Sequence, residues 1–296
     1  MMQLVFLGTG GSTPTKERGM PAIALQRDGD VFLFDCGEGT QMQAMKFDVN
    51  IAKIAAIFIT HTHGDHVIGI AGLVRTLALN KRPKPLEIFV PAGEEKKITT
   101  LLTFDKALIG YPVIVKGISS GVIYKGKDFT ISAFRLNHRV PTVGYVFREN
   151  DRRHFDKEKC MRLGLKGTMF RDLIAKGSIT VNGKRVSLSS VSTQERGKSI
   201  VYAGDTRPVA STVNAAKGAD VLIHESSFAD MHKSLAKERL HSTAGEAAKI
   251  AKKAGCKSLF LIHLSARYKN HEQLLKDAKS VFKNAQIARD GMRVEV

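Results

Sequence analysis

The feature that most constrains the fold of this chain is a cluster of metal-binding side chains directly after a short apolar segment. The segment 55–59 is typical of a buried strand, and His61, His63, Asp65 and His66 follow it. Residues two apart in an extended loop point the same way, so the first two histidines can bind one metal ion. The aspartate and the last histidine then face a second ion. The pattern H-x-H-x-D-H therefore predicts a metal site at the end of a buried strand.

Short apolar runs alternate with helical patterns along the rest of the chain, which predicts an α/β layered domain. The expected strands are 4–7, 31–34, 55–59, 86–90, 129–136, 200–203, 221–223 and 259–262, and the expected helices are 67–79, 242–254 and 271–282. Ser242 or Thr243 resembles a helix N-cap, with Glu246 in the first turn. Thr206, followed by Arg207 and Pro208, is also expected to cap a helix.

A basic segment interrupts this alternation at residues 151–198. It holds twelve lysines and arginines against five acidic residues, which is +7 of the net charge of +18. We expect a single domain over 1–296 with 151–198 as an inserted arm, in which Asn182 and Gly183 predict a hairpin. The charge excess favours a polyanionic partner, although a basic proteome or solubility would also explain it.

The three cysteines and the apolar runs bear on where the protein works. Cys36, Cys160 and Cys256 are odd in number and far apart, so they are expected to be free and buried, as in a reducing cytoplasm. No run of about 18 apolar residues exists, and the N-terminus lacks the pattern of a secretory signal. The sequence predicts a soluble cytoplasmic protein that does not enter a membrane.

The histidine cluster resembles the signature of the metallo-β-lactamase superfamily. That resemblance implies an α/β fold of four αββα layers and three later ligands, and His138, Asp205 and His263 stand in the right order after expected strands. It implies two Zn²⁺ ions per subunit. As the family assigns them, one ion is held by His61, His63, His138 and Asp205, and the other by Asp65, His66, Asp205 and His263.

Two dications about 3.5 to 4 Å apart repel strongly, so a shared carboxylate at Asp205 and a bridging hydroxide are required between them. That hydroxide would be the nucleophile. The family resemblance makes Asp65 the general base as well as a ligand, and it matches Asp35 to an aspartate that supports the histidine loop from outside the ligand set.

Three further matches resemble the ribonuclease Z family, which trims the 3′ ends of tRNA precursors, and together they span nearly the whole chain. They are the segment 6–19, which ends in Gly19 where the family usually has asparagine; the segment 35–41; and the ordered segments 204–208, 224–227 and 241–244. The resemblance implies zinc-dependent cleavage after the discriminator region of precursor tRNA. The products are a tRNA 3′-hydroxyl and a 5′-phosphate on the trailer.

The same resemblance implies roles for other residues. The leaving 3′-oxygen needs a proton, which His241, held by Glu225, would supply. The arm at 151–198 would grip tRNA phosphates, although Gly167 lacks the proline that often follows it in the family. A homodimer is implied as well. The expected RNA contacts are Lys16, Arg18, Arg207, Lys166, Arg171 and Lys176.

Other readings of this ligand set stay open. A small-molecule phosphodiesterase or a thioesterase of the glyoxalase II kind would need neither a basic arm nor so large a charge. A β-CASP nuclease would carry a large domain between Asp205 and His263, where only 57 residues stand. A catalytically dead tRNA-binding module would be expected to have lost ligands, and none is missing.

Overall fold

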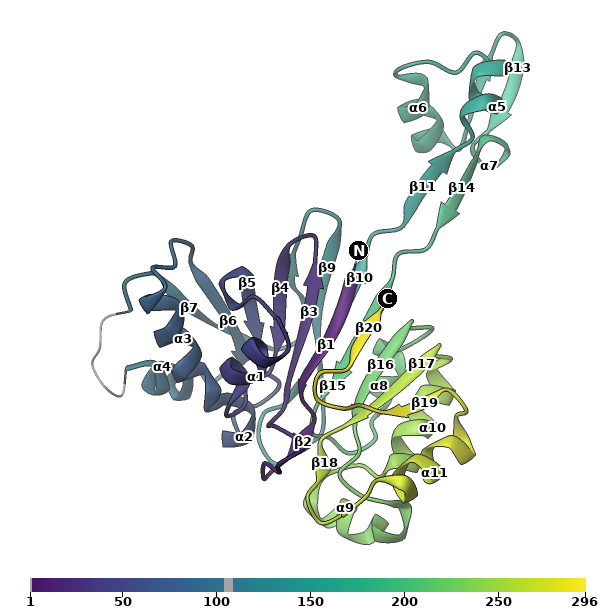
Figure 1. The fold of residues 1–296 in the computed structure, drawn as a ribbon. Coiled ribbons are helices and arrows are strands. Elements are labelled where there is room, and N and C mark those ends of the chain that lie inside the picture. Colours follow the sequence, from purple (N-terminus) through teal and green to yellow (C-terminus); the bar gives the residue numbers. More distant parts are fainter. Residues whose placement is uncertain (1, 104–108) are drawn as a thin grey trace. The chain divides into compact units, whose positions relative to one another are not determined.

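Two seven-stranded sheets form the frame of this protein, in a computed structural model that describes residues 2–103 and 109–296 (Figure 1). The first sheet has, in spatial order, β20 (Arg293–Glu295), β1 (Met2–Gly8), β3 (Ala22–Arg27), β4 (Asp30–Phe34), β5 (Ile54–Phe58), β6 (Leu86–Pro91) and β7 (Val113–Ile118). The second has β19 (Ala285–Ile287), β17 (Ser258–Ile262), β16 (Val221–Glu225), β15 (Ser199–Ala203), β10 (Val143–Glu149), β9 (Phe129–Arg135) and β8 (Gly121–Lys125). Two short strands, β2 (Gly10–Gly11) and β18 (Leu264–Ser265), pair in parallel.

The period-two alternation of side chains explains how the sheets stack. On β1, Leu4 and Phe6 belong to an aromatic-rich core that also takes residues from the second sheet, such as Tyr145 and Phe260. Val5 and Leu7 point the other way, into a separate core beneath helices. Each sheet therefore buries one face against the other sheet and one face against helices. The predicted four-layer αββα sandwich is confirmed.

Helices accompany both sheets. They are α1 (Thr40–Lys46), α2 (Gly64–Val67), α3 (Gly69–Leu79) and α4 (Glu95–Thr103), then α8 (Ala210–Ala215), α9 (Lys233–Arg239), α10 (Ala244–Ala254) and α11 (Glu272–Val281), with 3₁₀ turns at Ile51–Lys53 and Asp230–His232. Helices α1, α3 and α4 supply apolar side chains to the core of the first sheet, and α10 and α11 to that of the second. Within the described part of the chain, no helix has the length and apolarity needed to cross a membrane.

Parallel pairing brings the polar strand ends together. Strands β15, β16 and β17 run parallel, so the residues that follow or end them, Asp205, Glu225 and His263, share one edge of the second sheet. In the first sheet β4 and β5 are also parallel, which places Asp35 and His61 at neighbouring strand ends. Both sheets therefore bring polar residues to strand ends, where α/β folds build their sites.

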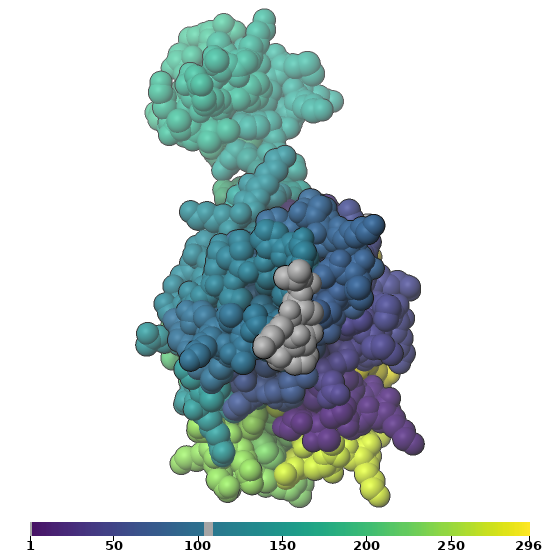
Figure 2. Space-filling view, turned by 90° about the vertical axis from the view of Figure 1, so that its left-hand side faces the viewer, coloured from purple at the N-terminus to yellow at the C-terminus, as the bar shows by residue number. Residues whose placement is uncertain are grey.

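Residues Arg148–Lys198 form a second compact unit. It contains β11 (Arg152–Phe155) paired with β14 (Ser192–Glu195), the hairpin β12 (Ser178–Val181) and β13 (Lys184–Ser187), and helices α5 (Lys157–Arg162), α6 (Met169–Lys176) and α7 (Leu188–Val191). The hairpin turns at Asn182 and Gly183 as expected, and both have positive φ. The unit has its own small apolar core, and its atoms gather in one body in the space-filling view (Figure 2).

Local expectations differ from the structure at two helix starts. Thr206 does not cap a helix: α8 begins at Ala210 after Val209, and the Thr206 hydroxyl donates instead to the carbonyl of Arg207. The helix expected at 67–79 is interrupted at Ile68 and begins earlier, at Gly64. The start of α10 is settled in favour of Thr243, which forms a capping box with Glu246.

All three cysteines are free and buried, as expected for small apolar side chains.

Candidate metal centre

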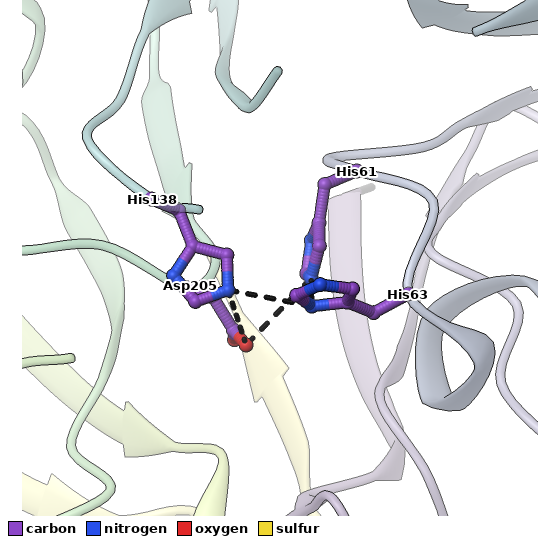
Figure 3. Close-up of side chains that lie close together, drawn as sticks. All are labelled: His61, His63, His138 and Asp205. Carbon is purple, nitrogen blue, oxygen red and sulfur yellow. Dashed lines mark hydrogen bonds and ion pairs between the residues drawn. The ribbon is translucent and has the colours of Figure 1, made fainter. Parts of the chain in front are cut away.

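The structure brings the seven side chains predicted as metal ligands to one place. His61, His63, His138 and Asp205 offer ligand atoms that all lie within 4.8 Å of one another, and these side chains point toward a common centre (Figure 3). Asp65, His66 and His263 form a second such group beside it. The ligands follow β5, β9, β15 and β17 or begin α2, so the two sheets jointly build the site.

Asp205 lies between the two groups and turns one oxygen to each. Its Oδ2 is 3.7 Å from His61 Nε2 and 3.8 Å from His138 Nε2. Its Oδ1 is 3.2 Å from His263 Nε2 and 3.5 Å from His66 Nε2. This is the geometry that a carboxylate shared by two cations requires.

The spacing of the ligand atoms fits bound metal ions. A tetrahedral ion with bonds of about 2.0 to 2.1 Å separates its ligands by roughly 3.3 Å, and His63 Nδ1 lies 3.0 Å from His61 Nε2 and 3.3 Å from His138 Nε2. Around the second group, three buried atoms have no hydrogen-bond partner among the described residues. They are His66 Nε2 and His263 Nε2, which belong to the group, and Asp205 Oδ1, which faces it. Buried polar atoms without partners are costly, so their convergence favours a cation between them.

The outward ring nitrogens of four ligand histidines are each held by the protein. The Nδ1 atoms of His61, His66, His138 and His263 lie 3.1, 2.8, 3.0 and 2.9 Å from Thr60 Oγ1, Asp35 Oδ2, the Leu240 carbonyl and Ser227 Oγ. Such contacts fix the orientation of an imidazole and leave the other nitrogen for a metal.

Asp35, predicted to support the histidine loop, has its carboxylate against His66. Its fully buried carboxylate accepts hydrogen bonds from the Thr60 backbone and hydroxyl and from the hydroxyl of Tyr202, in addition to its contact with His66. Its backbone is left-handed, with φ 55°, which aspartate tolerates better than most residues. Tyr202 has no motif that would have identified it, because its role depends on the packing of the two sheets.

Buried carboxylates dominate the electrostatics of the centre. Burial opposes a charged His66, but Asp35 and Asp205 outweigh it and hold the pKa of His66 well above its usual value. Burial also favours a neutral Asp205, yet His263 and His66 hold the pKa of this carboxyl well below its usual range. Burial keeps the pKa of His61 well below its ordinary value, so this ring is neutral and able to bind a metal. The Asp205 carboxylate therefore keeps its negative charge, which favours cations.

Glu225 and His241 form a hydrogen-bonded pair next to the ligands. Glu225 is fully buried, and its Oε1 lies 2.9 Å from His241 Nδ1. The same carboxylate accepts bonds from the backbone of Thr206, Ser227 and Ser242. Burial disfavours a charged His241, but Glu225 outweighs it and raises the pKa of His241 to about 9. His241 lines the pocket in front of the metal groups, so its Nε2 is the ring nitrogen left for a substrate.

Residues outside the histidine motif hold the ligand loops as well. The backbone N–H of Ser12 donates to Asp65 Oδ2 over 2.8 Å, and a Cβ on Gly11 would lie 2.5 Å from the His263 ring. Glu94, nearly buried, accepts the hydroxyl of Thr62 and pairs with Lys97 over 2.6 Å. Because Thr62 stands between two ligand histidines, this contact steadies the loop. Sequence reasoning did not find Glu94, since nothing local links it to residue 62.

The residues expected to contact RNA have different surroundings. Lys16 is exposed on the loop after β2, and Lys166, Arg171 and Lys176 are exposed on the second unit. Arg207 instead forms a two-pronged ion pair with Glu246, at 2.6 and 2.8 Å, and also donates to the His241 carbonyl. The Arg18 guanidinium is half-buried and donates to the Ala288 carbonyl over 2.7 Å. Both arginines are held by contacts within the protein.

Comparisons with known proteins also indicate a fold of the metallo-β-lactamase type. One family model, described as anti-Pycsar protein Apyc1, matches residues 2–106, and another, described as a beta-lactamase superfamily domain, matches residues 161–264. Among solved structures, the metallo-beta-lactamase fold protein YhfI from Bacillus subtilis is 21% identical over 100% of this chain and 99% of its own, with a TM-score of 0.72. The likeness to YhfI concerns the fold alone.

Other relatives are similar over their whole length. Proteins described as ribonuclease Z are 40% identical in Methanosarcina mazei, covering 100% of this chain and 98% of that protein, and 43% identical in Gemmatimonas aurantiaca, covering 98% and 95%. The structure of the short form of human tRNase Z is 28% identical, covers 99% of both chains and has a TM-score of 0.74.

Proposed function

This chain belongs to the ribonuclease Z family, and from that premise we propose that it is a metal-dependent endoribonuclease that removes the 3′ trailer from precursor tRNA. Cleavage after the discriminator region leaves a 3′-hydroxyl on the tRNA and a 5′-phosphate on the trailer. The observation that carries the chemistry is the division of the Asp205 carboxylate between two ligand groups.

Two Zn²⁺ ions are the cations that we assign to these groups. Imidazole and carboxylate donors suit zinc, and the side chains of the two groups would hold one ion each, with Asp205 common to both. When bound, such ions would supply a water of lowered pKa and would stabilise the charge that builds on an attacked phosphate. Asp65, whose Oδ2 also lies 3.5 Å from His263 Nε2, is placed to orient that water and accept its proton.

His241 is the proton donor in this proposal. As water oxygen bonds to phosphorus, the bond from phosphorus to the 3′-oxygen of the tRNA breaks, and that oxygen needs a proton. The Glu225 carboxylate keeps His241 protonated near neutral pH, because it raises the pKa of this ring to about 9. The proton would leave from Nε2, since Nδ1 is held by Glu225.

The second unit, Arg148–Lys198, is the proposed grip on the tRNA body. Its exposed cations, among them Lys166, Arg171 and Lys176, supply affinity for phosphates without reading sequence. Lys16 would add a contact beside the metal centre. A homodimer and a cytoplasmic location complete the proposal by analogy with the family.

The first test is cleavage of a precursor tRNA labelled at both ends, with the zinc-loaded protein and with protein stripped by a chelator. We expect one cut after the discriminator region, a tRNA 3′-hydroxyl, a trailer 5′-phosphate, and no cut without metal. Hydrolysis of a thioester or a small phosphodiester with an intact precursor would contradict the proposal.

A second test separates the proton donor from the ligands. His241→Ala should lower kcat by roughly 10²- to 10⁴-fold, the usual contribution of a general acid, while both metals stay bound. A precursor whose leaving atom is sulfur needs no proton donor, so most of the loss should vanish with it. Loss of a metal ion from this variant would instead make His241 a ligand.

A further inference from the structure

The pocket in front of the metal centre has a rim of arginines. It encloses about 420 Å³, and besides the metal groups and His241 its lining includes Gly11, Ser12, Arg139, Arg239 and Arg267. The only carboxylates among its lining residues are the ligands Asp65 and Asp205. A rim with three cations and no acid of its own favours a polyanion beyond the one phosphate under attack.

Arg139 and Arg239 belong together on one side of this rim. Arg139 follows the ligand His138, and Arg239 ends α9. Two hydrogen bonds join these segments: His138 Nδ1 to the Leu240 carbonyl at 3.0 Å, and Arg139 Nη2 to the Glu238 carbonyl at 3.2 Å. The pair is thereby fixed next to the first ligand group.

The charge of both arginines remains available to a ligand. The guanidinium of Arg139 donates to a neutral carbonyl, and it has no ion pair with a carboxylate among the described residues. Arg239 Nε lies 3.6 Å from Glu238 Oε1, but the two side chains are 57% and 68% exposed, and exposed ion pairs are weak. Guanidinium groups match phosphate oxygens with two parallel hydrogen bonds, so a phosphate would compete well with Glu238.

Another part of the pocket lining belongs to a different segment. There Gly11 lies against His263, and the Ser12 N–H donates to Asp65, so the loop that carries Lys16 starts at the second ligand group. In the proposed function the tRNA body has the unit Arg148–Lys198 as its grip, whereas the trailer has no contact assigned to it.

We propose that Arg139 and Arg239 form a binding subsite for the backbone phosphates of the single-stranded 3′ trailer. The inference rests on the proposed function and assigns to the trailer a contact site separate from the arm. Because the contacts go to phosphates, the subsite would accept trailers of any sequence and would favour those long enough to reach it.

The test compares trailers that differ only in their phosphates. One precursor carries a single trailer nucleotide, which has no internucleotide phosphate beyond the scissile one, and a second carries about ten nucleotides, enough for several phosphate contacts. A third has the long trailer with neutral methylphosphonates at its first two linkages. The variants are Arg139→Ala, Arg239→Ala and their combination, with Lys217→Ala, an exposed lysine outside the pocket, as the charge control.

We expect the double variant to raise KM for the long trailer roughly tenfold or more, with a much smaller effect on the single-nucleotide trailer. The slope of log affinity against log salt concentration should fall by about the amount that two phosphate contacts contribute. The methylphosphonate trailer should show this loss with the unmodified protein and little further loss with the variant, because both changes remove the same contact. Lys217→Ala should match the unmodified protein.

Equal losses on the short and long trailers, or full additivity with the methylphosphonates, would overturn the subsite while leaving tRNA processing intact. Failure of the unmodified protein to cut any precursor would overturn the proposed function and the subsite with it.

Discussion

The metal centre and the unit Arg148–Lys198 show two ways of handling charge in one chain. In the centre the ligands Asp205 and His263 are almost completely buried, and their contacts fix each atom. In the second unit Lys166, Arg171 and Lys176 are exposed, and among the described residues their side chains have no hydrogen-bond or ion-pair partner. Chemistry on one phosphate requires atoms in fixed positions, whereas attraction to a polyanion requires only charge within reach.

The two regions also differ in how much core supports them. The core between the two sheets contains 23 buried apolar residues, whereas that of the second unit contains six: Cys160, Leu165, Leu173, Val181, Val186 and Val191. A small core gives little stability of its own, so this unit is expected to open before the sandwich does. Mobile side chains can still bind phosphates through their charge, whereas metal binding needs side chains in fixed positions.

The largest effect is expected at Asp205, because in a site with fixed atoms even the replacement of one carboxylate oxygen should impair metal binding. Asp205→Asn keeps the shape but loses the shared charge, so both ions should bind poorly and cleavage should fall on the order of ten-thousandfold. Metal analysis and single-turnover cleavage would measure this. Asp48→Asn, at an exposed position with positive φ, is the matched control. Full metal content with near-normal rates would mean that Asp205 does not bridge.

Removal of the second unit should have the next largest effect, and only on tRNA. The Glu149 N–H bonds to the Lys198 carbonyl over 2.9 Å, so residues 151–197 can be replaced by a two-glycine turn. We expect kcat/KM for precursor tRNA to fall about a thousandfold through lost phosphate contacts, with hydrolysis of a small phosphodiester retained.

A charge variant tests whether that loss comes from the cations. Lys166→Ala, Arg171→Ala and Lys176→Ala together should reproduce much of the loss while the unit stays folded. If the deletion also removes small-substrate activity from a protein whose sandwich remains folded, the two regions are not independent.

A medium effect is expected at Asp35, which touches no substrate. Asp35→Asn suits the left-handed backbone but removes the charge that faces His66. Zinc affinity should fall by roughly 10- to 100-fold, as measured by competition with a chelator. Tyr202→Phe, which removes only one hydroxyl from the same carboxylate, should have a smaller effect. An unchanged affinity in the Asp35 variant would place the support for His66 elsewhere.

The smallest effect is expected for a single cation of the second unit. Lys176→Ala should weaken tRNA binding only about two- to threefold and lower the salt slope by about one, whatever the tRNA sequence. Binding titrations at several salt concentrations would measure it. A large, sequence-dependent loss would show that Lys176 occupies a fixed contact, contrary to the comparison.

The sequence predicted the frame of the site because each ligand has a local signal. His61, His138, Asp205 and His263 all follow apolar runs that form buried strands, and strand ends are readable from local patterns. The expectation that Thr206 caps a helix also relied on local signals, and it was wrong. A threonine and a proline near a helix are local signals too, but the contact that Thr206 makes depends on its neighbours in space.

What the sequence determined by itself is the set of candidate ligands, the layered sandwich and the excess of cations in 151–198, since residue type and periodicity are properties of the chain alone. Only the tertiary structure decided that each oxygen of Asp205 faces a different group, that Arg207 is committed to Glu246, and that Arg139 lies beside Arg239. The physical reason is distance along the chain. Segments a hundred residues apart meet only through the packing of sheets and helices, and no local pattern specifies which atoms then face each other.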